Sequence, residues 1–139
     1  EKNGISFIDD YAHLPTEVSS VLQAAKEGDW GRIICVFQPH RYSRTQDFWS
    51  DFSHSFQNAD VVYVTGIYSA GESPIPGVSG RLIADTVRES ESGKQVVYCE
   101  HRTELVDHIR SELTQGDLCL TLGAGDITTL PTELMSGLA

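Results

Sequence analysis

"RIICVF", residues 32–37, is a run of apolar side chains that follows a single arginine and contains no further polar residue. A strand with one solvated face alternates apolar and polar residues, whereas a continuous apolar run is typical of a strand covered on both faces, as in parallel sheets. Four other stretches have the same strand-like character: Ile5–Ile8, Val61–Thr65, Gln95–Cys99 and Asp117–Leu122. The pattern therefore predicts a buried, mostly parallel sheet.

Helical patterns separate these strand-like runs. Apolar residues recur every three or four positions, the spacing of one helix face, in five segments: Thr16–Glu27, Thr45–Gln57, from Ser79 to Val87, from Thr103 to Leu113, and after Pro131 with Leu134, Met135 and Leu138. We expect Thr103 to be an N-cap and the aromatic stripe to lie in the core: Phe48, Trp49, Phe52 and Phe56. The alternation predicts an α/β, three-layer, Rossmann-like sandwich with about five or six strands, of which one edge strand could be antiparallel.

Length and composition restrict the class of protein. The 139 residues fit one domain, residues 1–139. The net charge of −10 disfavours nucleic acid, because a phosphate-backbone binder needs a basic face. No apolar run approaches the ~20 residues of a membrane span, and no signal-peptide pattern opens the sequence, so we expect no membrane partner. Cys35, Cys99 and Cys119 lie in apolar runs, which predicts buried thiols in a cytoplasmic protein and no metal site.

Polar and ionisable residues follow all five strand-like runs. In open α/β sheets, ligands bind beyond the carboxyl ends of the strands, so these residues predict a binding site on one edge of the sheet. In chain order they are Asp9, Asp10, Tyr11 and His13; Gln38, His40, Arg41, Tyr42 and Arg44; Tyr68, Gly71 and Glu72; Glu100, His101 and Arg102; and Gly123, Gly125 and Asp126.

The same residues also have purely structural interpretations. Asp9 and Asp10 could solvate a turn at the sheet edge, and His13 could be a turn residue bonded to the backbone. The basic cluster of His40, Arg41 and Arg44 could pair with Asp47 or Asp51. The loop from Gly71 to Gly77 could fold over a ligand or simply connect two elements. These alternatives remain open at the level of sequence.

Several motifs are absent. No G-x-x-x-x-G-K-[ST] loop occurs, so the chain does not cradle a triphosphate alone, and no Ser or Cys nucleophile stands in an elbow motif. "GAGD" (123–126) is a weak dinucleotide signal because residue 128 is Thr. His54 and His108 are expected on helix surfaces. The sequence opens without Met and enters a strand almost at once, so we expect a piece of a longer protein that supplies half of a site.

Four motifs resemble the C-terminal domain of the Mur ligases of peptidoglycan synthesis: "DDYAHLPTEV" (9–18), "FQPHRYSRT" (37–45), "YSAGESPIPG" (68–77) and "GAGDI" (123–127). The resemblance covers essentially the whole chain, with the motifs in family order and at family spacing. The second and third motifs are narrower and are similar to the branch of the family that adds L-alanine. Leu14 departs from that branch, which commonly has a second His there.

The resemblance implies a three-domain, ATP-dependent acid–amino acid ligase. An N-terminal domain would hold UDP-N-acetylmuramate, a central domain would carry the P-loop and hold most of the ATP and Mg²⁺, and this domain would close over them. ATP would phosphorylate the muramoyl carboxylate, and the amine of L-alanine would attack the acyl phosphate. The isolated domain is expected to be inactive.

Residue roles also come from the resemblance. It implies that Asp10 and Tyr11 contact ATP, with Asp10 on the ribose. It implies catalytic roles beside the reacting groups for His13, His40, Arg41 and Arg44. It implies substrate-binding roles for Tyr68, Gly71, Glu72, Gly123, Gly125 and Asp126, and no metal ligand in this domain.

The alternative from a different class is a flavodoxin-like or receiver-like binding module without ligase activity. A receiver needs a phosphoacceptor Asp after its third strand, where this sequence reads "TGIYS" (65–69). A flavin binder needs a hydroxyl-rich phosphate loop after its first strand, and the acids of "DDYAHLP" (9–15) would repel a phosphate. Neither requirement is met.

Overall fold

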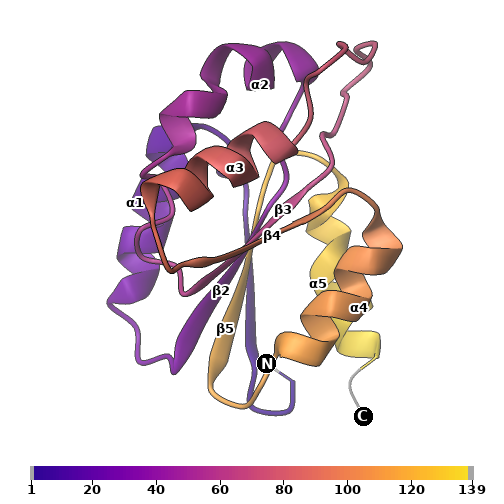
Figure 1. The fold of residues 1–139 in the computed structure, drawn as a ribbon. Coiled ribbons are helices and arrows are strands. Elements are labelled where there is room, and N and C mark those ends of the chain that lie inside the picture. The colour runs from indigo at the N-terminus through magenta and orange to yellow at the C-terminus, as the bar shows by residue number, and fades with distance from the viewer. Residues whose placement is uncertain (1, 138–139) are drawn as a thin grey trace.

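The computed structural model describes residues 2–137 and contains one five-stranded sheet in the order β1-β5-β2-β3-β4, with every pair of neighbours parallel (Figure 1). The strands are β1 (Ser6–Asp10), β2 (Arg32–Phe37), β3 (Val61–Thr65), β4 (Gln95–Cys99) and β5 (Asp117–Leu122). The prediction of a parallel α/β sandwich is confirmed, and the last four strands have the predicted bounds. No antiparallel edge strand occurs among the described residues.

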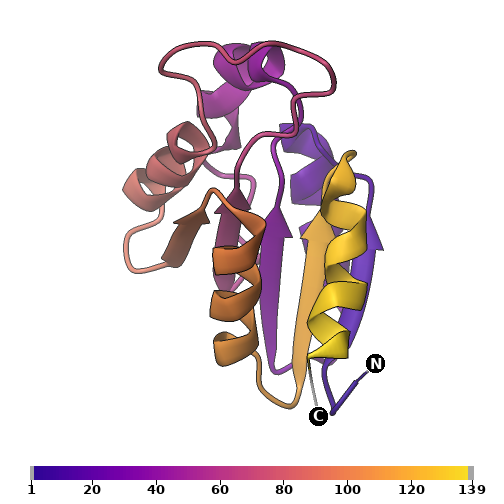
Figure 2. The same cartoon turned by 90° about the vertical axis from the view of Figure 1, so that its right-hand side faces the viewer.

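The helices cover both faces of the sheet. They are α1 (Pro15–Lys26), α2 (Tyr42–Phe48), α3 (Arg81–Ser90), α4 (Arg102–Glu112) and α5 (Leu130–Ser136), with short 3₁₀ turns η1 (Trp49–Phe52) and η2 (Asp126–Thr129). The chain crosses the sheet in one direction from β1 to β4 and returns to β5. Because such crossovers are right-handed, α4, which connects β4 back to β5, packs on the opposite face from the helices that connect β1 to β4. Figures 1 and 2 show α1, α2 and α3 on one face and α4 and α5 on the other.

Each face of the sheet has its own hydrophobic core. Leu22, Phe37 and Phe56 are fully buried beneath the face that carries α1, α2 and α3. Leu105 and Ile109 of α4 are buried on the other face together with the Tyr63 ring. The Tyr63 hydroxyl meets Nδ1 of the exposed His108 at 2.8 Å. The interior strands β2, β3 and β5 are therefore buried on both sides, as their continuous apolar runs predicted.

Several local predictions are wrong. The first strand begins at Ser6 and ends at Asp10, because Ile5 bridges to Lys2 instead. The helix expected over Thr45–Gln57 begins at Tyr42, ends at Phe48 and continues only as η1. The backbone turns at Phe48 (φ −122°, ψ 4°), which leaves that ring 42% exposed, whereas Phe52 and Phe56 are buried as predicted.

The N-cap of helix α4 is His101 and not Thr103, two positions earlier than predicted. Helix α5 begins at Leu130, and the predicted apolar position Leu138 lies outside the described residues. Cys35, Cys99 and Cys119 are buried free thiols, as expected. Burial raises the pKa of Cys119 to about 12, so this group stays a thiol. None of the helices within residues 2–137 is long and apolar enough to cross a membrane.

An ion pair between a partly exposed arginine and a buried aspartate stabilises the amino-terminal edge of the sheet. The Arg32 guanidinium donates to both carboxylate oxygens of Asp117, at 3.1 Å from Nε and 2.8 Å from Nη2. The same carboxylate, 2% exposed, accepts the Thr114 backbone N–H at 2.8 Å. The pair joins β2 to β5 at the start of their shared register.

We expect Asp117→Ala to destabilise the chain by about 2 kcal/mol, because it removes the acceptor of the Thr114 N–H and the main partner of the Arg32 guanidinium, which keeps only its bonds to Glu112. Chemical denaturation measures this change. The matched control is Asp29→Ala, since Asp29 is exposed, and it should change the free energy of unfolding by less than about 0.5 kcal/mol. Equal stabilities for the two variants would contradict the structural role of the pair.

Candidate functional site

The register of the sheet brings four strand ends to one line. Asp10 pairs with Leu122 across β1 and β5. Leu122 pairs with Phe37 across β5 and β2, and Phe37 pairs with Val64 across β2 and β3. The loops that follow these strands therefore leave the same edge, toward which the arrowheads point in Figure 2. The prediction that the polar strand ends share one edge is confirmed.

Four aromatic and imidazole rings lie in sequence along this edge and form what we call the ring row: Tyr11, His13, His40 and Tyr68. Successive ring centroids are each 5.6 Å apart. The His40 and Tyr68 rings are nearly parallel, at 18°, whereas Tyr11 meets His13 edge-on. The ring row connects the loops after β1, β2 and β3. Tyr11 is 71% exposed and presents an open ring at its end.

His13 is held in one orientation by its neighbours. Its Nδ1 lies 3.1 Å from the Tyr11 carbonyl oxygen and 3.5 Å from Glu17 Oε1. Because a carbonyl oxygen only accepts, Nδ1 carries the proton in the neutral ring, and Nε2 is then the nitrogen with a free lone pair. Glu17 Oε1 also accepts the backbone N–H groups of His13 and Leu14, which lower the pKa of Glu17. Glu17, in the first turn of α1, thus helps to orient His13, whose Nε2 could act as a base.

His40 has the opposite arrangement. Arg44 Nη1 lies 3.4 Å from His40 Nδ1, and a guanidinium only donates, so Nδ1 accepts and the proton is on Nε2. Burial lowers the pKa of His40, and the nearby His13, Arg44 and Arg41 lower it further. In their neutral forms, His40 can therefore donate from Nε2, and the neighbouring His13 can accept at its own Nε2.

Arg41 has a strained backbone. Its φ of 72° and ψ of 141° belong to a region that is essentially restricted to glycine. The conformation is held because the Arg41 N–H donates to the Tyr68 carbonyl and the Arg41 carbonyl accepts from Thr45, through both N–H and Oγ1. Neither Arg41 nor Arg44 forms an ion pair with Asp47 or Asp51, which removes the structural alternative for the basic cluster.

The two adjacent acids have different environments. Asp9 accepts the hydroxyls of Thr121 and Thr128 at 2.5 and 2.9 Å, so it ties β1 to β5 and η2. Asp10 accepts only the Ala12 N–H, through Oδ1 at 2.9 Å, and its Oδ2 has no hydrogen-bond partner within the described residues. Asp10 and Tyr11 line a shallow cavity of about 420 Å³ against α1. The structural interpretation thus fits Asp9, whereas Asp10 is available to a ligand.

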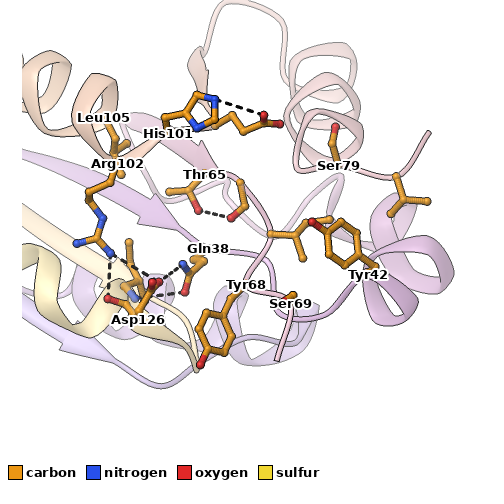
Figure 3. Close-up of a pocket in the computed structure, with 15 residues that line it drawn as sticks. Gln38, Tyr42, Thr65, Tyr68, Ser69, Ser79, His101, Arg102, Leu105 and Asp126 are labelled. Atoms are coloured by element: carbon orange, nitrogen blue, oxygen red, sulfur yellow. Dashed lines mark hydrogen bonds and ion pairs between the residues drawn. The ribbon is translucent and has the colours of Figure 1, made fainter. Parts of the chain in front are cut away.

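A larger cavity of about 570 Å³ lies beside the ring row (Figure 3). It is lined by residues that follow β2, β3, β4 and β5, among them Gln38, Tyr68, Arg102 and Asp126. Gly71 and Glu72 do not line it. Glu72 instead accepts the Ser43 N–H and hydroxyl at 3.1 and 2.5 Å, and these bonds lower the pKa of Glu72. The residues of the predicted substrate loop therefore have different roles in the structure. Tyr68 lines the cavity, whereas Glu72 is bonded to Ser43 at the start of α2.

The Gly123–Asp126 loop packs closely on the cavity wall. A Cβ on Gly125 would overlap with the Tyr68 ring, and one on Gly123 would stand 2.8 Å from Ile127 Cγ2. The sequence placed Gln38 and Arg102 at the predicted binding edge but gave neither a specific role, and both hold this loop. Their position directly after a strand was the available signal. Their bonding partners were not visible in the sequence.

An open parallel sheet with ionisable side chains and cavities at its carboxyl edge defines an α/β domain that binds its ligand at that edge. A family model described as "Mur ligase, glutamate ligase domain" matches residues 1–125. The chain belongs to this family, as the motifs predicted. The family match gives no support to the flavodoxin-like or receiver-like alternative.

Similar proteins agree with this assignment. The chain is 47% identical over 136 residues to the UDP-N-acetylmuramate–L-alanine ligase of Desulforamulus reducens, and the match covers 98% of this chain and 29% of that protein. The crystal structure of the UDP-N-acetylmuramate–alanine ligase of Thermotoga maritima is similar with a TM-score of 0.71 and 29% identity, over 96% of this chain and 26% of that one. The MurF ligase of the same organism, solved in complex with ADP, has a TM-score of 0.64 at 16% identity over 98% of this chain and 29% of that one, which shows the fold alone. The chain spans less than a third of each of these proteins.

We expect Arg41→Gly to be more stable than Arg41→Ala by about 1 kcal/mol, because only glycine adopts the local backbone conformation without strain. Thermal unfolding of both variants measures the difference. The control pair is Gln46→Gly and Gln46→Ala within α2, where the order should be reversed by about the same amount. An Arg41→Ala variant as stable as Arg41→Gly would contradict the strain.

We expect His40 to titrate below the value of about 6.5 that is usual for histidine, with its neutral form protonated on Nε2. Because folded His40 binds a proton more weakly than the unfolded chain does, its contribution to stability is complete above that pH and is lost as the pH falls. Nitrogen-15 NMR of the imidazole measures both properties. A midpoint at or above the usual value, or a proton on Nδ1, would contradict the geometry.

Proposed function

We propose that the chain is the C-terminal domain of a UDP-N-acetylmuramate–L-alanine ligase of peptidoglycan precursor synthesis. The observation that carries the proposal is the shared edge on which Asp10 and the ring row lie beside Arg44, open to solvent and without a P-loop of its own. Such an edge fits a domain that completes a site built elsewhere. The names of the similar proteins support the same activity.

In the proposed reaction, ATP transfers its terminal phosphoryl group to the muramoyl carboxylate. The amine of L-alanine then attacks the acyl phosphate, phosphate leaves, and an amide bond forms. Mg²⁺, held by the central domain, would neutralise charge on the ATP phosphates. Within residues 2–137 no cluster of three or more His, Cys, Asp or Glu side chains could hold a metal, so this domain would contribute to the reaction through its own fixed side chains.

Asp10 is proposed to bind the nucleotide. Its unpaired Oδ2 can accept hydrogen bonds from ribose hydroxyls, and the neighbouring Tyr11 offers an exposed ring beside the same cavity. A ligase that contains the same fold, the MurF ligase of Thermotoga maritima, was solved in complex with ADP.

The basic cluster is proposed to act on the reacting groups. Arg44, positioned by His40, and the strained Arg41 would face the acyl phosphate and the carboxylate of the amino acid. Cations fixed in place stabilise charge that develops in a transition state without reorganisation at the moment of reaction. The free lone pair on Nε2 of His13 would accept the proton that the attacking amine releases. His40 would donate from its own Nε2 to an anionic oxygen.

The cavity beside the ring row is proposed to receive the amino acid. Tyr68 and Asp126 line it, and the close-packed Gly123 and Gly125 let the loop between them approach the Tyr68 ring. Glu72 is proposed to act through the loop that it anchors to Ser43, together with Gly71.

We further propose that residues 1–139 form one domain of a three-domain enzyme and have no ligase activity alone. The share of 29% that the chain covers in a similar ligase supports this division. The other domains would bind UDP-N-acetylmuramate and ATP. Three free thiols fit a reducing compartment such as the cytoplasm.

In the full-length enzyme, we expect Asp10→Ala and Arg44→Ala each to lower ligation of L-alanine by about a hundredfold or more, because each removes a fixed charged group from the reacting complex. Phosphate release and amide formation measure the rate. His54→Ala, an exposed histidine outside the site, is the control. Near-normal turnover in both variants, with the fold intact, would defeat the proposed function.

A further inference from the structure

We propose that Gln38 is a positioning residue whose side-chain amide sets the Gly123–Asp126 loop against Tyr68 and thereby fixes the amino-acid side of the site. This inference rests on the proposed function. Gln38 directly follows β2 and is 7% exposed. It is not expected to touch the reacting atoms, and it acts through the loop that it holds.

Both ends of the Gln38 amide are bonded to the segment after β5. Nε2 donates to Asp126 Oδ1 at 2.6 Å, and Oε1 accepts the Ile127 N–H at 3.2 Å. Figure 3 shows the side chain directed at Asp126 across the cavity wall. The Gln38 backbone N–H also donates to the Leu122 carbonyl at 3.0 Å, so the sheet register fixes the base of the side chain.

The loop is held from the other side as well. Arg102 Nη2 donates to the Asp126 carbonyl at 2.9 Å, and its guanidinium is also bonded to Thr129 and Glu133. The Asp126 side chain is therefore held by a short hydrogen bond from Gln38 and by a longer ion pair with Arg102, whose Nη2 lies 3.7 Å from Asp126 Oδ1. The Asp126 backbone carbonyl is held by Arg102. Losing the Gln38 amide would release the side facing the cavity while Arg102 still holds the fold.

The loop is packed closely against Gln38 and Tyr68. A Cβ on Gly125 would stand 2.8 Å from Gln38 Oε1 and would overlap with the Tyr68 ring. The Tyr68 ring in turn lies 5.6 Å from His40, nearly parallel to it. A displacement of the Gly123–Asp126 loop would therefore move Tyr68, and through the stacked Tyr68–His40 contact it would also move the ring row.

The amide of Gln38 satisfies both partners at once, and its closest isosteres do not. Asp126 requires a donor and the Ile127 N–H requires an acceptor. Glutamate at position 38 would keep the acceptor but place a second carboxylate against Asp126, which like-charge repulsion disfavours. Methionine would fill the space and provide neither.

The test uses the full-length enzyme and four variants: Gln38→Glu, Asp126→Asn, the double variant Gln38→Glu/Asp126→Asn, and Gln57→Glu as an exposed control. For Gln38→Glu we expect KM for L-alanine to rise by about tenfold or more, with a much smaller change in KM for ATP. The effect should diminish at acidic pH, where one shared proton restores the hydrogen bond.

The double variant reverses the polarity of the pair, because the amide introduced at position 126 can donate to the carboxylate introduced at position 38. We expect its KM for L-alanine to return to within a few-fold of the value for Asp126→Asn alone. Failure of this recovery, an unchanged KM in Gln38→Glu, or an equal loss of affinity for ATP and L-alanine would overturn the inference.

A measurement on the chain itself separates this inference from the proposed function. In Gln38→Met, the backbone amide of Ile127 should exchange its hydrogen about tenfold faster or more, since it loses its acceptor. The amide of Leu120 within β5 should keep its rate. An unchanged rate at Ile127 would contradict the positioning role, whereas a wild-type enzyme without ligation of L-alanine would contradict only the function.

Discussion

The backbone pairing of β5 with β1 on one side and β2 on the other is the constraint on which the rest of the structure depends. It places Asp10, Leu122 and Phe37 on one line across the sheet. A shift of one residue would move side chains of β5 from one core to the other, because successive residues of a strand face opposite sides. The register is therefore specified by both cores at once. The polar residues that follow the aligned strand ends therefore lie at the same edge of the sheet.

The two edges of the sheet have different properties. At the amino-terminal edge, Arg32 and Asp117 are paired with good geometry and contribute to stability. At the carboxyl edge, Arg41 has a strained backbone and the carboxylate of Asp10 is only partly bonded. Strain and unused bonding capacity lower stability, and they persist where the surrounding structure holds them in place. The division is what a domain needs if one edge keeps the fold and the other takes part in chemistry.

Much of the fold could be predicted from the sequence, because the strands are buried on both faces and their apolar runs are continuous. The bounds of β2 and β5 came directly from "RIICVF" and "DLCLTL". The helix predicted over Thr45–Gln57 is wrong, because the spacing of its aromatic residues is helical but its backbone leaves the helical conformation at Phe48. The family motifs indicated candidate site residues but not the hydrogen-bond partners of those residues. Asp9 and Asp10 are adjacent acids, and their bonding differs because the hydroxyls of Thr121 and Thr128 donate to Asp9, which the sequence did not predict.

Hydrogen exchange of the full-length enzyme tests most directly whether one edge of this domain meets the substrates. The enzyme would be compared alone and with a non-hydrolysable ATP analogue, UDP-N-acetylmuramate and L-alanine. We expect protection in the loops of residues 9–14, 38–44, 66–72 and 123–127, and no change in the loops at the opposite edge, residues 28–31, 91–94 and 114–116. Protection confined to the opposite edge, or no change at either edge, would contradict the account.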